Sequence, residues 1–363
     1  MKTEMTGNDI LQHFEIETNA ESYGNGHIND TYLVTMPRYI LQRINTSIFT
    51  NPDELMDNIE NVTAFLRRKL IAAGGDADRG TLTVVPAKDG GKYYKVDDNN
   101  VFRVYRFIEG TKTIENSKTA EDLYEAGVGF GNFQKLLADF PVDRLYETIR
   151  DFHHTPKRIE ALREAVREDK AGRAESVKKE IEFALENAGW ADSVVKGMED
   201  GRIPVRVTHN DTKINNILFD QESGKAVCVI DLDTVMPGSA LYDFGDVLRM
   251  GGSSAAEDET DLDKVWFEVS AFEAFARGYL SEMKDALTET EIALLPLSVK
   301  LMTYECGIRF LTDYLNGDTY FKIHREHHNL DRARNQFKLV ADISAREAVL
   351  AEAVERGMST AAV

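Results

Sequence analysis

Apolar residues in the first third of the chain follow a pattern typical of short strands and one helix. Runs rich in β-branched and aromatic residues predict strands at 31–34, 38–44, 81–85, 92–96 and 101–108. Between Pro52 and Gly74, apolar residues recur at helical spacing: Leu55, Ile59, Val62, Leu66 and Leu70. The pattern predicts a small sheet that carries one helix.

The pattern changes after Gly110. Residues from about 117 to 203 are mostly helical and charged, a β-rich segment follows at 205–235, and helical periodicity returns at 262–283, 292–315 and 326–357. We therefore expect an α+β protein with a smaller N-terminal lobe at 1–109 and a larger helical C-terminal lobe at 110–363.

Composition narrows the classes of function. The chain has 363 residues, 62 acidic and 43 basic, with a net charge of −19. A surface with this much negative charge repels the phosphate backbone of nucleic acids. We therefore expect no nucleic-acid partner. Cys228 and Cys306 lie in apolar sequence and predict buried thiols rather than a disulfide framework. No signal peptide and no apolar run of membrane length is found, so we expect a cytoplasmic protein that has no membrane partner. We also expect a monomer.

The most informative segment is Val207-Thr-His-Asn-Asp-Thr-Lys-Ile-Asn-Asn-Ile-Leu-Phe219, followed by Val227-Cys-Val-Ile-Asp-Leu-Asp233. Phosphoryl transfer from ATP needs a carboxylate near the acceptor hydroxyl and oxygen ligands for magnesium. In kinase-like sites an Asp, four residues, an Asn and a strand ending in Asp supply them. Asp211, Asn216 and Asp231 have this spacing, and His209 precedes the first by two residues.

Each part alone is weak, because Asx residues cap turns throughout proteins. The order of strand, polar loop, Asn, apolar strand, turn, apolar strand and Asp is what favours a kinase-like site. Asp233 lies two positions beyond Asp231, on the same side of an extended strand. A second metal site, a substrate contact and a turn cap all remain open for Asp233.

These residues carry a family resemblance. The run His209-Asn-Asp-Thr-Lys-Ile-Asn-Asn216, with Ile230-Asp-Leu-Asp233 and Leu241-Tyr-Asp-Phe-Gly-Asp246, resembles the aminoglycoside phosphotransferase-like kinase superfamily. Further stretches, spread from about residue 20 to 340, resemble the bacterial N-acetylhexosamine 1-kinases within it: Tyr23-Gly-Asn-Gly-His-Ile-Asn29, Val104-Tyr-Arg-Phe-Ile-Glu109, Met236-Pro-Gly-Ser239 and Glu305-Cys-Gly-Ile-Arg-Phe-Leu311.

The resemblance implies a protein-kinase-like bilobal fold and transfer of the γ-phosphate of ATP to the anomeric hydroxyl of N-acetylglucosamine or N-acetylgalactosamine, leaving ADP. Asp211 would be the catalytic base and contact the substrate. Asn216 and Asp231 would bind Mg²⁺, and Asp233 would bind a second metal or the substrate. Gly24 and Gly26 would lie at the nucleotide phosphates, and His27 would contact the sugar.

The third strand departs from the broader kinase pattern. The lysine that usually grips the α- and β-phosphates falls at Gln42, and Arg43 should face the other side of the strand. Glu60 occupies the position of the usual ion-pair carboxylate on the following helix. We expect Gln42 and Glu60 near the nucleotide, although an ion pair between these two positions is in doubt and Glu60 also suits a solvated helix face.

Remaining contacts are expected at two further places. Tyr105 and Phe107 lie where adenine would bond to the hinge backbone, in a segment that an ordinary core strand explains equally well. Arg309 and Tyr320 would bind the acceptor sugar through hydroxyl and acetamido oxygens, and Gly307 would allow a close approach. The remaining clustered histidines predict solvated side chains rather than a metal site: His153, His154, His324, His327 and His328.

Two classes of alternative stay open. One is another small-molecule kinase of the superfamily, acting on choline, homoserine or an aminoglycoside. The other is a non-catalytic pseudokinase, which the presence of Asp211, Asn216 and Asp231 disfavours.

Overall fold

The structure is a computed structural model that describes residues 7–14, 16, 20–23, 29–34, 38–115 and 119–360. The chain divides into two compact units. The first contains Met1–Lys112, Asp139–Arg150 and Leu218–Met236, and the second contains Thr113–Ala138, Asp151–Ile217 and Pro237–Val363. The expected lobes at 1–109 and 110–363 stay a prediction.

An antiparallel sheet forms the framework of the first unit. Its strand order is β1-β2-β3-β6-β4, and β5 also pairs with β6. Their bounds are β1 (Ala20–Ser22), β2 (Asp30–Val34), β3 (Tyr39–Ile44), β4 (Val84–Val85), β5 (Tyr94–Asp97) and β6 (Asn100–Arg106). A second sheet has the order β10-β9-β7, with β7 (Thr111–Lys112), β9 (Ile217–Asp220) and β10 (Ala226–Val229).

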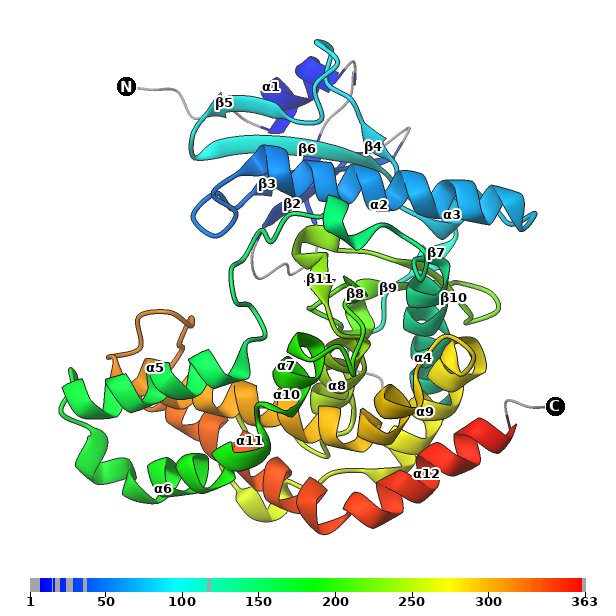
Figure 1. Cartoon of the computed structure of the whole chain (residues 1–363). Helices are drawn as coiled ribbons and strands as arrows, with labels where there is room; N and C mark the ends of the chain where they lie inside the picture. Colours follow the sequence, from blue (N-terminus) through cyan, green and yellow to red (C-terminus); the bar gives the residue numbers. More distant parts are fainter. Residues whose placement is uncertain are drawn as a thin grey trace. The chain divides into compact units, whose positions relative to one another are not determined.

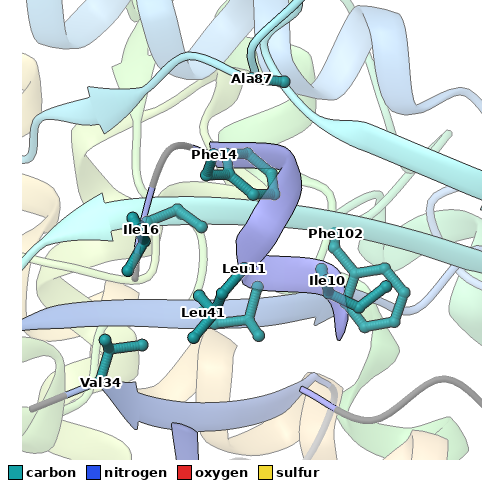
Figure 2. Close-up of a cluster of buried hydrophobic side chains, with 9 residues drawn as sticks. Ile10, Leu11, Phe14, Ile16, Val34, Leu41, Ala87 and Phe102 are labelled. Carbon is teal, nitrogen blue, oxygen red and sulfur yellow. The ribbon is translucent and has the colours of Figure 1, made fainter. Parts of the chain in front are cut away.

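Neighbouring positions on β3 and β6 face opposite sides of the sheet. Leu41 pairs with Val104, and the next pair is Gln42 with Arg103. Leu41 and Val104 belong to the apolar cluster drawn in Figure 2. Because side chains alternate along a strand, Gln42 and Arg103 lie on the other face. This face carries the charged groups described below.

The predicted helix is confirmed as α2 (Pro52–Ala72). Asn51 caps its first turn by accepting a hydrogen bond from the Glu54 amide, and Pro52 occupies a position where its missing N–H costs nothing. Apolar residues at helical spacing are buried: Leu55, Ile59, Val62 and Leu66. A short helix, α3 (Ala77–Gly80), follows.

The polar-looking N-terminus contains a helix that the sequence pattern missed. Helix α1 (Gly7–Leu11) and the 3₁₀ turn η1 (Gln12–Phe14) place Ile10, Leu11 and Phe14 against the sheet (Figure 2). Five residues are too few to show helical periodicity, so only packing reveals the element.

Helices dominate the second unit (Figure 1). They are α4 (Ala120–Leu136), α5 (Thr155–Glu168), α6 (Lys178–Glu186), α7 (Ser193–Glu199), α8 (Ala240–Gly251), α9 (Val269–Met283), α10 (Glu289–Leu315), α11 (His328–Ala345) and α12 (Glu347–Thr360). The pattern at 326–357 predicted one stretch, which the structure divides at Arg346. The short strands β8 (Arg206–Thr208) and β11 (Met236–Gly238) pair with each other.

Glycines set the close approach of α4 and α9. A Cβ on Gly127 would lie 2.3 Å from the Phe275 carbonyl oxygen, and one on Gly278 would lie 2.0 Å from that of Tyr124. Both distances are shorter than van der Waals contact, so neither position accepts a side chain unless the helices separate. Each helix therefore contacts the backbone of the other at a glycine.

Two further expectations concern membranes and thiols. Across the described ranges, every helix is too short or too polar to span a bilayer. Cys228 is buried as expected, whereas Cys306 is only partly buried, and both thiols are free.

Candidate active site

The loop after β8 is held in place by one buried carboxylate. Asp243, in the first turn of α8, accepts hydrogen bonds from the amides of His209 (2.9 Å) and Asn210 (2.8 Å). Its own carbonyl accepts one from the Thr212 hydroxyl at 2.7 Å. Burial raises the pKa of Asp243. The sequence analysis named the motif that contains Asp243 but assigned no role to this residue.

Asp211 lies in this clamped loop and is half-buried. Its two carboxylate oxygens lie 2.7 and 2.9 Å from the Lys213 ammonium. Burial raises the pKa of Asp211, but the adjacent Lys213 charge more than offsets this, and the net pKa lies below its ordinary value. Asp211 is therefore an anion at neutral pH and can accept a hydrogen bond or a proton from a hydroxyl group.

Asn216 is placed directly against Asp211 by the 3₁₀ turn η5 (Ile214–Asn216). The Asn216 amide donates a hydrogen bond to the Asp211 carbonyl at 2.8 Å. Its Oδ1 accepts no hydrogen bond from the residues that the structure describes. An amide oxygen oriented in this way can serve as a hard-cation ligand.

A buried ion pair supports the same loop from the other side. His153 places Nδ1 2.8 Å from Glu305 Oε1 and Nε2 3.0 Å from the Asn210 carbonyl oxygen. Both acceptors lack a proton, so this geometry suits a doubly protonated ring. Burial lowers the pKa of His153, but the Glu305 charge raises it to a net value above normal. The expectation of a solvated His153 is wrong, because a carboxylate from α10 covers it; His328 is also buried rather than solvated.

Arg309 lies one helical turn beyond Glu305 on α10, among aromatic rings. Its guanidinium carbon is 5.8 Å from the centroid of Phe152, 6.0 Å from that of Tyr320 and 5.5 Å from that of Phe321. The side chain is half-buried, yet within the described ranges its N–H groups make no hydrogen bond or ion pair. Arg309 and Tyr320 thus lie beside each other, and Tyr320 is 68% exposed. Their role in sugar binding stays a prediction.

The expected close approach at Gly307 is occupied by protein. A Cβ at this position would lie 2.7 Å from the Phe337 ring of α11. Gly307 therefore allows two helices to pack, which leaves no room there for a ligand.

In the first unit, the two acidic residues after β10 have different surroundings. Asp231 is exposed and has a left-handed backbone, with φ of 59°. Asp233 is buried: Oδ1 lies 2.5 Å from Arg103 and Oδ2 accepts a hydrogen bond from Asn29 at 2.7 Å. An exposed carboxylate is a suitable magnesium ligand, whereas Asp233 is buried against Arg103 and Asn29.

Gln42 and Glu60 have separate partners. The Gln42 side-chain oxygen accepts two hydrogen bonds from Arg103, at 2.9 and 3.1 Å. Glu60 pairs with Lys92 at 2.9 Å, so an ion pair does form on α2 but with a lysine from outside β3. Arg43 points away from Gln42, is exposed and pairs with Asp30, as the strand alternation predicted. The sequence analysis assigned no role to Arg103, although an arginine within an apolar strand is an unusual signal.

The other expected nucleotide and sugar contacts are placed as follows. Tyr105 is buried at the end of β6, and Phe107 is half-buried beneath the Arg38 guanidinium at 4.1 Å. The Phe107 amide donates to the Arg38 carbonyl at 3.2 Å. Gly24, Gly26 and His27 lie outside the described residues.

Comparisons with known proteins add an independent observation. The structure is similar to an aminoglycoside phosphotransferase from Alicyclobacillus acidocaldarius, with a TM-score of 0.64, 13% identity and coverage of 98% of both chains. It is also similar to a microcompartment-associated aminopropanol kinase (TM-score 0.56, 18% identity, 95% of this chain and 97% of the other). A third likeness is to amicoumacin kinase hAmiN in complex with AMP-PNP, Ca²⁺ and Ami (TM-score 0.58, 14% identity, 88% and 87%).

At these identities the likenesses establish the protein-kinase-like fold that the sequence predicted. The family match concerns the sequence itself, because the model of the phosphotransferase enzyme family matches residues 19–285. This range contains the clamped loop, Asn216 and Asp231. The chain therefore belongs to the phosphotransferase enzyme family.

Proposed function

We propose that the protein transfers the γ-phosphate of ATP to the anomeric hydroxyl of an N-acetylhexosamine, N-acetylglucosamine or N-acetylgalactosamine. The bond between the γ-phosphorus and the β,γ-bridging oxygen breaks, a bond from phosphorus to the sugar O1 forms, and ADP leaves. Support comes from the family membership and from the resemblance of stretches along the chain to N-acetylhexosamine 1-kinases.

Asp211 has the properties that the acceptor side of this reaction requires. It is anionic at neutral pH, and the clamp of Asp243 on the preceding amides fixes its loop. We assign to it the orientation of the sugar hydroxyl and the acceptance of its proton. Catalysis of this kind depends mainly on positioning and charge stabilisation.

Oxygen donors suit a magnesium ion. Carboxylate and amide oxygens are hard ligands of the type that Mg²⁺ prefers. Following the family resemblance, we assign a magnesium-ligand role to Asp231 and another to Asn216. Magnesium would neutralise charge on the phosphates. A metal role for Asp233 remains a prediction, as do the nucleotide roles of Gly24, Gly26, Gln42, Glu60, Tyr105 and Phe107 and the sugar role of His27.

The observation that carries the choice of acceptor is the guanidinium of Arg309, which makes no hydrogen bond or ion pair among the described residues. Its N–H donors are available to acceptor lone pairs, which an acetamido oxygen and ring hydroxyls supply. A second cation, Arg158, is nearby: burial and then the charge of Arg309 lower its pKa, although the charges of Glu305 and Asp151 act in the opposite direction. Choline, an amino alcohol or an aminoglycoside would bring another positive charge to this pair of arginines, so a neutral acceptor fits better.

A coupled assay of ADP release over an acceptor panel tests the proposal. The panel contains N-acetylglucosamine, N-acetylgalactosamine, glucosamine, choline, ethanolamine, homoserine and kanamycin. Turnover is expected only with the two acetylated sugars. Glucosamine is the matched control, since it replaces the acetamido group with an ammonium. Preferred turnover of any cationic acceptor would contradict the proposal, and intact Mg²⁺–ATP binding without turnover would favour a pseudokinase.

A further inference from the structure

A buried arginine in the first unit has no role in the proposed reaction. Arg103, on β6, is 1% exposed. Its guanidinium donates to Gln42 Oε1 from Nε and Nη2, pairs with Asp233 Oδ1 at 2.5 Å and lies 5.2 Å from the centroid of the Tyr105 ring. Burying a cation is costly unless it finds hydrogen-bond acceptors and a counter-charge. Gln42 supplies the acceptor, and Asp233 supplies the counter-charge.

Gln42 explains why this arrangement is stable. It stands opposite Arg103 in the strand register, and its amide oxygen accepts two of the five guanidinium N–H groups. A lysine at position 42 would place a second cation against Arg103 and remove the acceptor. Gln42 and Arg103 therefore depend on each other. This pairing explains why position 42 holds a glutamine in place of the usual kinase lysine.

On its other side, Arg103 contacts the turn after β10. Asp233 joins Arg103 to Asn29, whose own side-chain oxygen accepts a hydrogen bond from the Asn45 amide at 2.9 Å. Two residues further, the Val235 carbonyl accepts a hydrogen bond from Asn58 of α2 at 3.0 Å. The segment 233–235 is thus tied to the sheet and to α2 within the same unit.

This anchoring bears directly on Asp231. With φ of 59°, Asp231 has a left-handed backbone, a conformation that Asp and Asn adopt more readily than other non-glycine residues but less readily than the right-handed one. Asp231 is exposed, whereas Asp233 is buried.

We propose that Arg103, oriented by Gln42, is a positioning residue for Asp231 that acts through its ion pair with Asp233. This inference rests on the proposed function, since it takes Asp231 as the metal ligand, and it gives Asp233 a structural role in place of a metal-binding one. Residues that orient a metal ligand commonly affect metal affinity by 10–100-fold when they are changed.

The test compares Arg103→Met, Asp233→Asn and the double variant of the full chain. Binding of AMP-PNP is titrated calorimetrically with and without Mg²⁺, and amide hydrogen exchange at 231–235 is followed in the nucleotide-free protein. We expect each single variant to weaken Mg²⁺-dependent AMP-PNP binding by about 10–100-fold and to speed exchange. The double variant should be no weaker than the poorer single variant, because both disrupt one interaction.

Two controls separate the outcomes. Arg43→Met removes an exposed arginine from the neighbouring strand position and should change neither measurement. Asp231→Asn should weaken Mg²⁺-dependent binding while amide exchange stays normal. Two milder variants replace Arg103→Met if it does not fold. Asp233→Asn is isosteric, and Gln42→Met keeps the charges of both Arg103 and Asp233. Both variants still test whether the ion pair between Arg103 and Asp233 positions Asp231.

The results that overturn the inference are distinct from those that overturn the proposed function. Weaker AMP-PNP binding in Arg103→Met with unchanged or tighter binding in Asp233→Asn would show that Arg103 contacts phosphate directly. Normal exchange at 231–235 in both variants would show that the turn is not held by this pair. Wild-type protein that binds no Mg²⁺–AMP-PNP would instead contradict the proposed function. Amide exchange at 231–235 would still show whether Arg103 and Asp233 hold this turn in place.

Discussion

The imidazole of His153 and the carboxylate of Glu305 form a buried ion pair, with 2.8 Å between Nδ1 and Oε1. The Thr155 hydroxyl donates to the other carboxylate oxygen at 2.6 Å, and the second ring nitrogen reaches the Asn210 carbonyl beside Asp211. The pair therefore connects α10 to the loop that carries Asp211, within one unit.

This pair predicts a pH window of stability. The raised pKa of His153 stabilises the fold fully below the ordinary value of 6.5, and this contribution is lost as the pH rises through the raised pKa. The pKa of Glu305 is lowered in spite of burial, because His153 is close; its contribution is present above 4.5 and is lost as the pH falls through the lowered pKa. The pair should contribute most between these two ordinary values.

His153→Gln leaves Glu305 buried without a charged partner. We expect a loss of about 3–5 kcal/mol in the free energy of unfolding near pH 5.5, measured by urea titration, and a smaller loss near pH 9. The exposed His324→Gln should change stability by less than about 0.5 kcal/mol. A pH-independent loss in His153→Gln would refute the ion-pair account.

Asp211→Asn keeps the size of the side chain but removes its ability to take a proton. We expect kcat to fall by about 10²–10⁴-fold, while AMP-PNP binding and the sugar KM change little. Steady-state kinetics and calorimetry measure both quantities. A kcat near that of the wild type would remove Asp211 from the role of base.

The metal ligands should differ in severity. Asp231→Ala should abolish turnover at ordinary magnesium concentrations because it removes a charged ligand, whereas Asn216→Ala should be partly restored by more Mg²⁺ or by Mn²⁺. The exposed Asp98→Ala serves as the control for loss of an acidic side chain. Wild-type metal dependence in both ligand variants would mean that the ion is held elsewhere.

Arg309 should act on the acceptor alone. Arg309→Met is expected to raise the sugar KM by about 10–100-fold, as loss of hydrogen bonds from a charged group predicts, with the KM for ATP unchanged. Arg309→Lys keeps the charge but loses the planar donors, so it should recover little. Faster turnover of choline or ethanolamine in Arg309→Met than of the sugars would indicate a cationic acceptor. Arg163→Met, on the exposed side of α5, is the matched control.

Local patterns explain which parts of the structure could be predicted. The α2 helix has spaced apolar residues, a capping Asn51 and Pro52 at its start, and each signal lies within a few positions of the chain. The spacing of Asp211 and Asn216 is likewise local, because one 3₁₀ turn brings them into contact.

The missed features depend on contacts between distant positions. His153 is followed by a histidine and a charged helix, which resembles a solvated segment, and only the fold brings Glu305 to it. Arg103 lies in an apolar strand, and its ion-pair partner, Asp233, is far along the chain. Buried charges of this kind are recognised by their partners, and a single sequence without structure does not reveal the pairing.

The position of phosphorylation tests the central proposal most directly. Wild-type enzyme is incubated with ATP and N-acetylglucosamine, and the product is identified by ³¹P and ¹H NMR, alongside the 1-deoxy and 6-deoxy sugars. A base held at one point reaches only the hydroxyl that is in line with the γ-phosphate. We predict a 1-phosphate, turnover of the 6-deoxy sugar, and competitive inhibition without ATP consumption by the 1-deoxy sugar. A 6-phosphate product, or turnover of the 1-deoxy sugar, would contradict the account.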